Sequence, residues 1–222
     1  MLPLLLAVAL AAEPAEPGQV SGRVIEAVLA TIQASPTRPV RPITLTRLRE
    51  EARVALVARG ATEAAFGRLD GKALAAALEW LIDQTLVAEE SDRLLVAEVG
   101  REEGLQEVRR FRARFASPEE YARFLAGNDA GEEELIVTLA RTLRVQRFVE
   151  GRVGQAVRVS DAEIDEYLRA RGVGTDPSAA RDAVRAHLGE QRLAAEVRKI
   201  VGELRARATV RILVSPVEVV PD

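Results

Sequence analysis

The chain has 222 residues and contains no cysteine. This absence excludes disulfide bonds, thiol catalysis, cysteine-ligated metals and a lipid-anchored N-terminal cysteine. The single histidine, His187, has Glu190 and Gln191 as helical neighbours, which is not the spacing of a metal site. We therefore interpret His187 as a helix-surface residue and expect no metal. Nucleophile elbows, phosphate loops and dinucleotide fingerprints are also absent, so we expect neither enzyme activity nor a cofactor.

The chain also has no excess of basic over acidic residues. The formal net charge is −3, which argues against nucleic acid as the main partner. Apolar residues make up 48% of the chain and charged residues 29%, the composition of an ordinary globular protein with a hydrophobic core.

Long hydrophobic runs are missing except near the N-terminus. The run Leu4–Leu10 is too short to cross a bilayer. It is followed by small residues up to Ala12 and by a charged, proline-rich stretch, a pattern that resembles a secretory signal, although the usual positive residues before it are absent. We expect residues 1–12 to be a signal peptide and residues 13–22 a flexible linker, in a periplasmic or secreted protein. The alternative is a frayed apolar tail.

The stretch from Asp176 to Ser215 changes its periodicity near Ala208. It opens with the cap residue Asp176 and a proline, and apolar residues then recur at helical spacing up to Leu204. From Thr209 to Val214, alternate residues are apolar, which predicts a strand. A lone strand leaves backbone groups unpaired on both edges, so this segment needs a partner.

The second strand candidate is Arg23–Ile32, although its valines could also line a helix. Between the two candidates the spacing of apolar residues predicts helices, several with clear starts such as Ser117-Pro118 and the capping box at Ser160–Glu163. We therefore expect a mainly α fold, a multi-helix domain over residues 23–215 in which the N-terminal and C-terminal strands pair, followed by a tail at 216–222.

The order of these elements resembles the N-terminal chaperone domain of SurA-like periplasmic proteins, which belongs with the peptide-binding region of trigger factor. Four segments carry the resemblance: Arg23–Ile32 with the following Pro42-Ile43-Thr44-Leu45, Leu78–Ala88, Val157–Ile164 with Tyr167, and Glu203–Ile212. The resemblance implies a polypeptide-binding chaperone of the same fold.

The sequence departs from the isomerase members of that family between residues 168 and 177. Those members carry a parvulin domain at this point, and so few residues cannot form one. The resemblance therefore implies a chaperone-type domain without prolyl isomerase activity.

Aromatic residues are scarce, at 4% of the chain, and four of them lie close together in the sequence. Most aromatics in such a chain belong to a core. The alternative is that they line a groove for unfolded polypeptide, which offers apolar side chains and free backbone groups. The candidate polypeptide-binding residues are Phe111, Phe115, Tyr121 and Phe124.

Two charge clusters have simpler explanations than a binding site. The acids Glu132-Glu133-Glu134 suit the first turn of a helix, where they interact favourably with its dipole. The arginines between Arg109 and Arg114 alternate with phenylalanines, as in an amphipathic helix, although contact with an anionic lipid or nucleic acid is the other interpretation.

These observations lead to two hypotheses on function. The first is an exported chaperone that binds unfolded or partly folded polypeptides, such as precursors of outer-membrane proteins, through an apolar groove. The second is a structural or interaction module with one dedicated protein partner. Neither requires stable insertion into a membrane.

Overall fold

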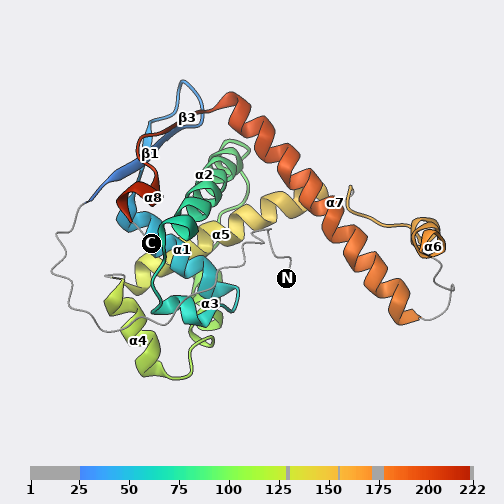
Figure 1. Cartoon of the computed structure of the whole chain (residues 1–222), viewed down its shortest axis with the longest axis horizontal. Helices are drawn as coiled ribbons and strands as arrows, with labels where there is room; N and C mark the ends of the chain where they lie inside the picture. The colour runs from blue at the N-terminus through green and yellow to red at the C-terminus, as the bar shows by residue number, and fades with distance from the viewer. Residues whose placement is uncertain (1–25, 129–130, 155, 172–177, 221–222) are drawn as a thin grey trace.

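The computed structural model describes residues 26–128, 131–154, 156–171 and 178–220. The expected signal peptide, the expected linker, the start of the first expected strand and the Asp176-Pro177 cap lie outside these residues. The elements are β1 (Val28–Gln33), β2 (Arg41–Thr44), α1 (Leu45–Ala58), the 3-10 turn η1 (Thr62–Ala65), α2 (Gly71–Arg93), α3 (Arg101–Arg112), α4 (Pro118–Gly127), α5 (Glu132–Val153), α6 (Asp161–Ala170), α7 (Ser178–Arg207), β3 (Thr209–Ile212) and α8 (Pro216–Val219). The chain is mainly helical with one small antiparallel sheet, as predicted (Figure 1).

The sheet joins the two ends of the described chain. Its strand order is β2-β1-β3, and β1 pairs antiparallel with β3, with Ala30 opposite Ile212 and Ile32 opposite Val210. This confirms the predicted pairing of the terminal strands. β2 was not predicted as a strand, because the region before α1 contains three prolines. It lies at an edge of the sheet, a position in which a strand tolerates proline, because the N–H that Pro42 lacks is not needed to pair with a further strand.

Helix α2 is the centre of the fold. Asp70 caps it by accepting a hydrogen bond from the backbone N–H of Ala73 at 2.7 Å. Its buried stripe includes Leu74, Leu81 and Ile82, all at most 1% exposed. A helix buried on so much of its circumference must be covered from several sides, and α1, α5, α7 and α8 all pack against it (Figure 1).

The buried apolar residues form two clusters. The first joins the sheet to α1, α2, the second half of α5 and the C-terminal half of α7. The second lies among the end of α1, η1, α3, α4 and the first half of α5. Along α5, Leu135 and Leu139 therefore belong to the second cluster, whereas Val145 and Phe148 belong to the first. The seam between the clusters crosses α1 and α5.

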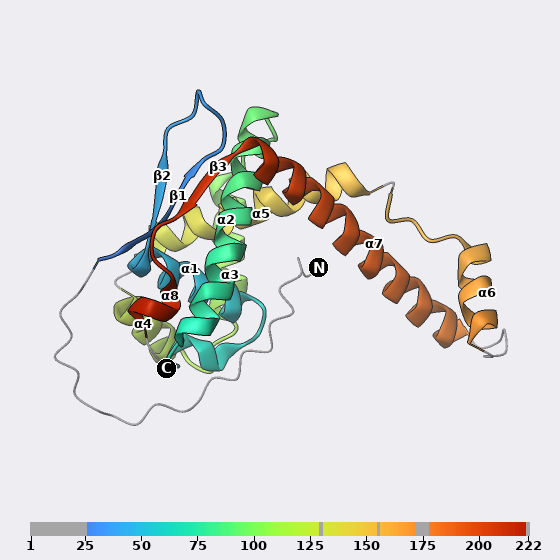
Figure 2. The same cartoon turned by 45° about the horizontal axis from the view of Figure 1, so that its top comes forward.

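Helix α7 projects from the body like an arm, with α6 near its far end (Figures 1 and 2). Ser160 and Glu163 form the predicted capping box of α6. At the near end of α7, Arg205 donates from Nε to Asp83 of α2 at 2.5 Å and from Nη2 to Glu79 at 2.8 Å. The arm is thus fixed to the central helix at its C-terminal end.

Residues 216–220, assigned to a tail from the sequence, are folded. They form α8 and its C-cap, and Pro216 and Val220 are buried against α2. Pro216 occupies the first turn of this short helix, a position that suits proline.

Candidate functional site

The four aromatic residues proposed from the sequence come together, but mainly inside the protein. The ring centroids of Phe111 and Phe124 are 5.4 Å apart, and those of Phe115 and Tyr121 are 5.7 Å apart. Phe111, Tyr121 and Phe124 are 2%, 6% and 1% exposed, and Phe115 is half-buried. They form the centre of the second core cluster, where tilted ring contacts of this kind add stability beyond burial alone.

Tyr121 has a polar group inside this cluster. Its hydroxyl is buried, and burial, together with the nearby carboxylate of Glu132, raises the pKa of the phenol. The guanidinium of Arg112 lies over its ring at 5.6 Å. Because these rings are packed against one another, a polypeptide could contact them only if α3 and α4 separated. Their role in binding remains a prediction.

A cavity lies at the seam between the two core clusters. It has a volume of about 280 Å³ and is lined from α1, α2, α5 and the segment after α3. Its apolar walls are formed by Val54, Ala55, Ala58, Trp80, Leu139 and Val145. Exposed residues such as Thr142 and Arg114 also line it, so it is open to solvent.

Small side chains explain why this space is empty. Ala55 and Ala58 face it from α1, and Thr138 and Thr142 face it from α5, at the three- and four-residue spacings that share a helix face. Larger residues at these positions would fill the seam between the clusters. The three- and four-residue spacing of these small side chains is visible in the sequence. Only the packing shows that the alanines of α1 face the threonines of α5 across the cavity.

The polar groups of the lining differ in whether they are paired. The carboxylate of Glu51 accepts from Arg47 at 2.9 Å and from Arg141 at 2.5 Å, and its side chain is 10% exposed. For Arg59, by contrast, the contact that the structure shows is with Trp80, whose ring centroid lies 6.0 Å from the guanidinium carbon. Although Arg59 is exposed overall, the protein around its guanidinium displaces water, and this desolvation lowers its pKa. Sequence reasoning missed Arg59, and it considered Arg114 only as part of the Arg109–Arg114 run, which it interpreted as the polar side of an amphipathic helix.

Trp80 contributes a second unpaired group. The residue is half-buried and its ring lines the cavity, while its indole Nε1 is buried without an acceptor among the described residues. A buried donor without a partner costs roughly 1–3 kcal/mol. Because Nε1 itself is buried, this unmade hydrogen bond is a cost of the packing around Trp80 and not a group that a ligand in the cavity could reach.

The remaining sequence candidates lie elsewhere. His187 is exposed on α7, with its ring 5.9 Å from that of Tyr167 and hydrogen-bonded to Gln191. Within the residues that the structure describes, no group of three or more acidic or histidine side chains could hold a metal ion. Glu132–Glu134 occupy the first turn of α5, and Glu133 pairs with Arg101 at 2.6 Å. Arg109 and Arg110 pair with acids of their own helix.

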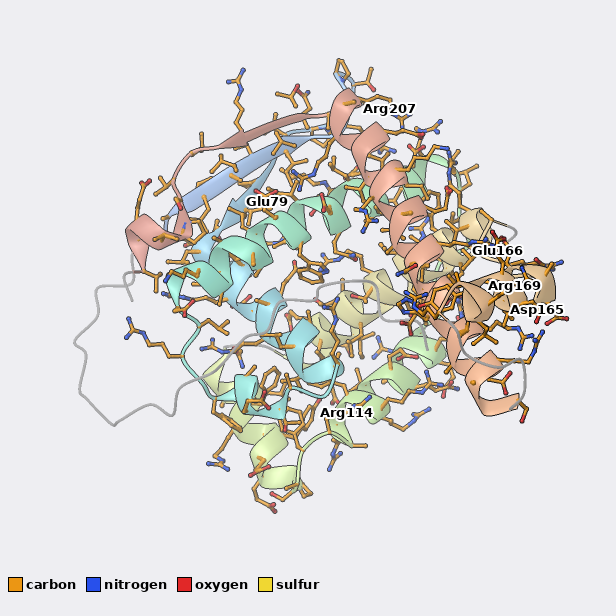
Figure 3. All side chains as sticks on the ribbon, turned by 45° about the vertical axis from the view of Figure 1, so that its right-hand side comes forward. Glu79, Arg114, Asp165, Glu166, Arg169 and Arg207 are labelled. Carbon is orange, nitrogen blue, oxygen red and sulfur yellow. The ribbon has the colours of Figure 1, made fainter. Side chains whose placement is uncertain are left out.

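Figure 3 places Arg114 on the opposite side of the molecule from Arg207, which lies at the end of α7 near the sheet. Arg207 and Arg93 both pair with the buried carboxylate of Glu90, at 3.5 Å and 2.7 Å, and the hydrogen bonds from Arg93 hold the pKa of Glu90 below its usual value. These cations are therefore part of the joint between α2 and α7. Arg59 and Arg114 at the cavity, by contrast, have no carboxylate within ion-pair distance among the described residues.

Comparison of the chain with models of known families, with curated proteins and with solved structures found no match. Among the described helices, none is both long and apolar enough to cross a membrane.

Proposed function

We propose that this protein is an exported, chaperone-like protein that binds non-native polypeptide segments and has no prolyl isomerase activity. The cavity between α1, α2 and α5 is the observation that supports this proposal. Unfolded chains present apolar side chains, and an open apolar hollow can bury one of them without a large rearrangement of the body.

The polar rim of the cavity fits the same role. Gln84 and Gln146 line it together with the arginines, and their amides can pair with backbone groups on either side of a bound side chain. Amide contacts of this kind do not depend on client sequence, and a single buried side chain contributes only about 1.5–3 kcal/mol. Weak binding and rapid exchange are therefore expected.

Aggregation of an unfolded client tests the proposal. A denatured outer-membrane β-barrel protein is diluted from urea, and light scattering is followed with and without the full chain at near-stoichiometric ratios. We expect scattering to fall and the rate of prolyl isomerisation in a reporter peptide to stay unchanged. Unchanged scattering, with circular dichroism showing a folded helical protein, contradicts the proposal.

A cavity-filling variant links the activity to the site. Ala58→Phe and Ala55→Phe both place a ring where the hollow now lies, and each is expected to reduce the suppression of aggregation. Ala126→Phe is the matched control, because Ala126 is exposed on α4 outside the lining. Thermal unfolding checks that each variant remains folded. Equal suppression by all four proteins would place client binding outside the cavity.

Export is tested separately. If the apolar run Leu4–Leu10 is part of a signal peptide, the mature protein recovered from the periplasm or medium begins after Ala11 or Ala12. Recovery of the intact chain from the cytosol contradicts export.

The exposed edge of the sheet favours the second candidate, a module with one dedicated partner. β3 is an edge strand, and its last residue, Ile212, and the following Leu213 are each 54% exposed. An apolar edge strand can accept a strand from another chain. A charge at this edge, as in Ile212→Lys, should abolish binding of such a partner and leave the suppression of aggregation intact.

A further inference from the structure

The cavity has a positive charge that the described protein does not neutralise. Three charged side chains line it: Glu51, Arg59 and Arg114. Glu51 is already paired with Arg47 and Arg141. Neither Arg59 nor Arg114 has a carboxylate within ion-pair distance among the residues that the structure describes. Both arginines therefore bring positive charge to one cavity whose single carboxylate is already used.

Arg114 lies beside the C-terminal end of α1, where Arg59 is located. Arg59 is the C-cap of α1, and Nη1 of Arg114 lies 3.9 Å from the position that a Cβ would take on the next residue, Gly60. The end of a helix carries about half a negative charge, which favours cations there. Half a charge does not balance two guanidinium groups, so capacity for an anion remains.

The size of the cavity limits what the anion can be. Small-molecule pockets typically have volumes of about 300–1,000 Å³, and this one has about 280 Å³. Nucleotides and larger cofactors do not fit such a space. The apolar walls from α1, α2 and α5 also disfavour a fully hydrated anion such as inorganic phosphate, which has no apolar part to pack against them.

We propose that this cavity binds a carboxylate attached to an apolar group. Arg59 and Arg114 bind the carboxylate oxygens, for which the guanidinium fork is well suited. Trp80, Leu139 and Val145 enclose the apolar part. In the client binding proposed above, on which this choice of source rests, the group is the C-terminal residue of a polypeptide. A free apolar acid is the other source of the same chemistry.

Trp80 makes the proposal directly measurable. It is the only tryptophan of the chain and lines the cavity, so its fluorescence reports on ligands there. The full chain is titrated with three probes: a hexapeptide ending in phenylalanine with a free carboxylate, the same peptide as its C-terminal amide, and 3-phenylpropionate. We expect saturable binding of the free-acid peptide and at least roughly tenfold weaker binding of the amide, because a charged hydrogen-bond partner is lost.

Arg59→Gln and Arg114→Gln test the two cations. Each should weaken binding of the free-acid peptide by roughly tenfold and should leave binding of the amide almost unchanged. Arg198→Gln is the matched control, since Arg198 is exposed on α7 and does not line the cavity. It should bind like the unaltered protein.

The outcomes separate the sources and the two proposals. Preference for the free-acid peptide over 3-phenylpropionate supports a chain terminus as ligand. Equal or tighter binding of 3-phenylpropionate, lost in Arg59→Gln, supports the site with a free acid as ligand. Equal affinity for acid and amide, or no effect of either arginine variant, overturns the carboxylate proposal. If aggregation is still suppressed in that case, the chaperone proposal stands without it.

Discussion

The carbonyl oxygen of Val220 lies 2.5 Å from the position that a Cβ would take on Gly71. The Cα of Val217 lies 2.8 Å from the same position. Both distances are shorter than any real contact of a Cβ, and both involve backbone that cannot rotate away. The absence of a side chain at Gly71 therefore allows α8 to pack against the first turn of α2. The last described residues of the chain are held by the central helix.

Gly71→Ala should destabilise the protein. The added methyl group forces α8 away from α2, and overpacking of this kind costs about 1–3 kcal/mol. Urea unfolding followed by circular dichroism measures the change. Gly202→Ala is the control, because Gly202 is exposed on α7 and nothing lies within 4 Å of its Cβ position. It should stabilise by about 0.5–1 kcal/mol, since alanine favours helix. Two variants of equal stability would contradict the packing of α8.

Phe124→Ala tests whether the aromatic cluster is core. Phe124 is 1% exposed and contacts the rings of Phe111 and Phe115. Truncating a buried phenylalanine typically costs 3–5 kcal/mol, so the midpoint of urea unfolding should fall sharply. Phe66, which is 50% exposed, is the matched control, and Phe66→Ala should cost less than about 1 kcal/mol. A stable Phe124→Ala protein that binds clients poorly would instead favour these rings as a binding surface.

The joint between α7 and α2 is tested by a double-mutant cycle. Arg205 and Asp83 are each about one-third exposed, at 35% and 32%, and burial raises the pKa of Asp83 although Arg205 is bonded to it. The free energies of unfolding of Arg205→Ala, Asp83→Ala and the double variant should give a coupling near 1 kcal/mol. The pair Arg101–Glu133, 67% and 65% exposed, should give less than about 0.5 kcal/mol. Equal couplings would mean that the Arg205–Asp83 pair contributes no more to the joint than an exposed surface pair does.

The pairing of the terminal strands could be predicted because an alternating apolar pattern is short-range information. Val210 lies in a segment with such a pattern, and a strand next to the last long helix needs a partner. The partner segment, Arg23–Ile32, was identified by its β-rich composition, although its valines could also have lined a helix. β2 could not be predicted in the same way. Its sequence, Arg41-Pro42-Ile43-Thr44, contains a proline that normally indicates a loop, and only its position at the sheet edge makes the proline acceptable.

The candidate site was less accessible to sequence reasoning than the fold. The clustered aromatics could be found because they are rare and close in sequence, but their burial depends on how α3 and α4 pack. Nothing in the sequence around Arg59 or Arg114 distinguishes them from the other arginines of the chain. They become unusual only when α1 and the end of α3 bring them to one cavity without counter-ions. A missing partner is a property of the three-dimensional arrangement.

The contact between α6 and α7 should depend on acid. The side chain of Arg192, together with the backbone and hydroxyl of Ser160, lowers the pKa of Glu163 from 4.5 to about 2. Because the pKa is lower in the folded protein, the contribution of this carboxylate to stability is fully present above about pH 4.5 and is lost as the pH falls through about 2. A carbon NMR titration of the Glu163 carboxyl group should therefore show a midpoint near pH 2.

Arg192→Gln removes the strongest of these interactions and should move the Glu163 midpoint upward, toward the 4.5 of an unperturbed glutamate. Ser160→Ala should move it less, because its backbone N–H still donates to the carboxylate. The same titration separates the effects of the cation and the cap. A midpoint that stays unchanged in Arg192→Gln would mean that α7 does not hold α6 through this pair. The arm would then depend on Ile164 and Leu168, which are buried on the inner face of α6.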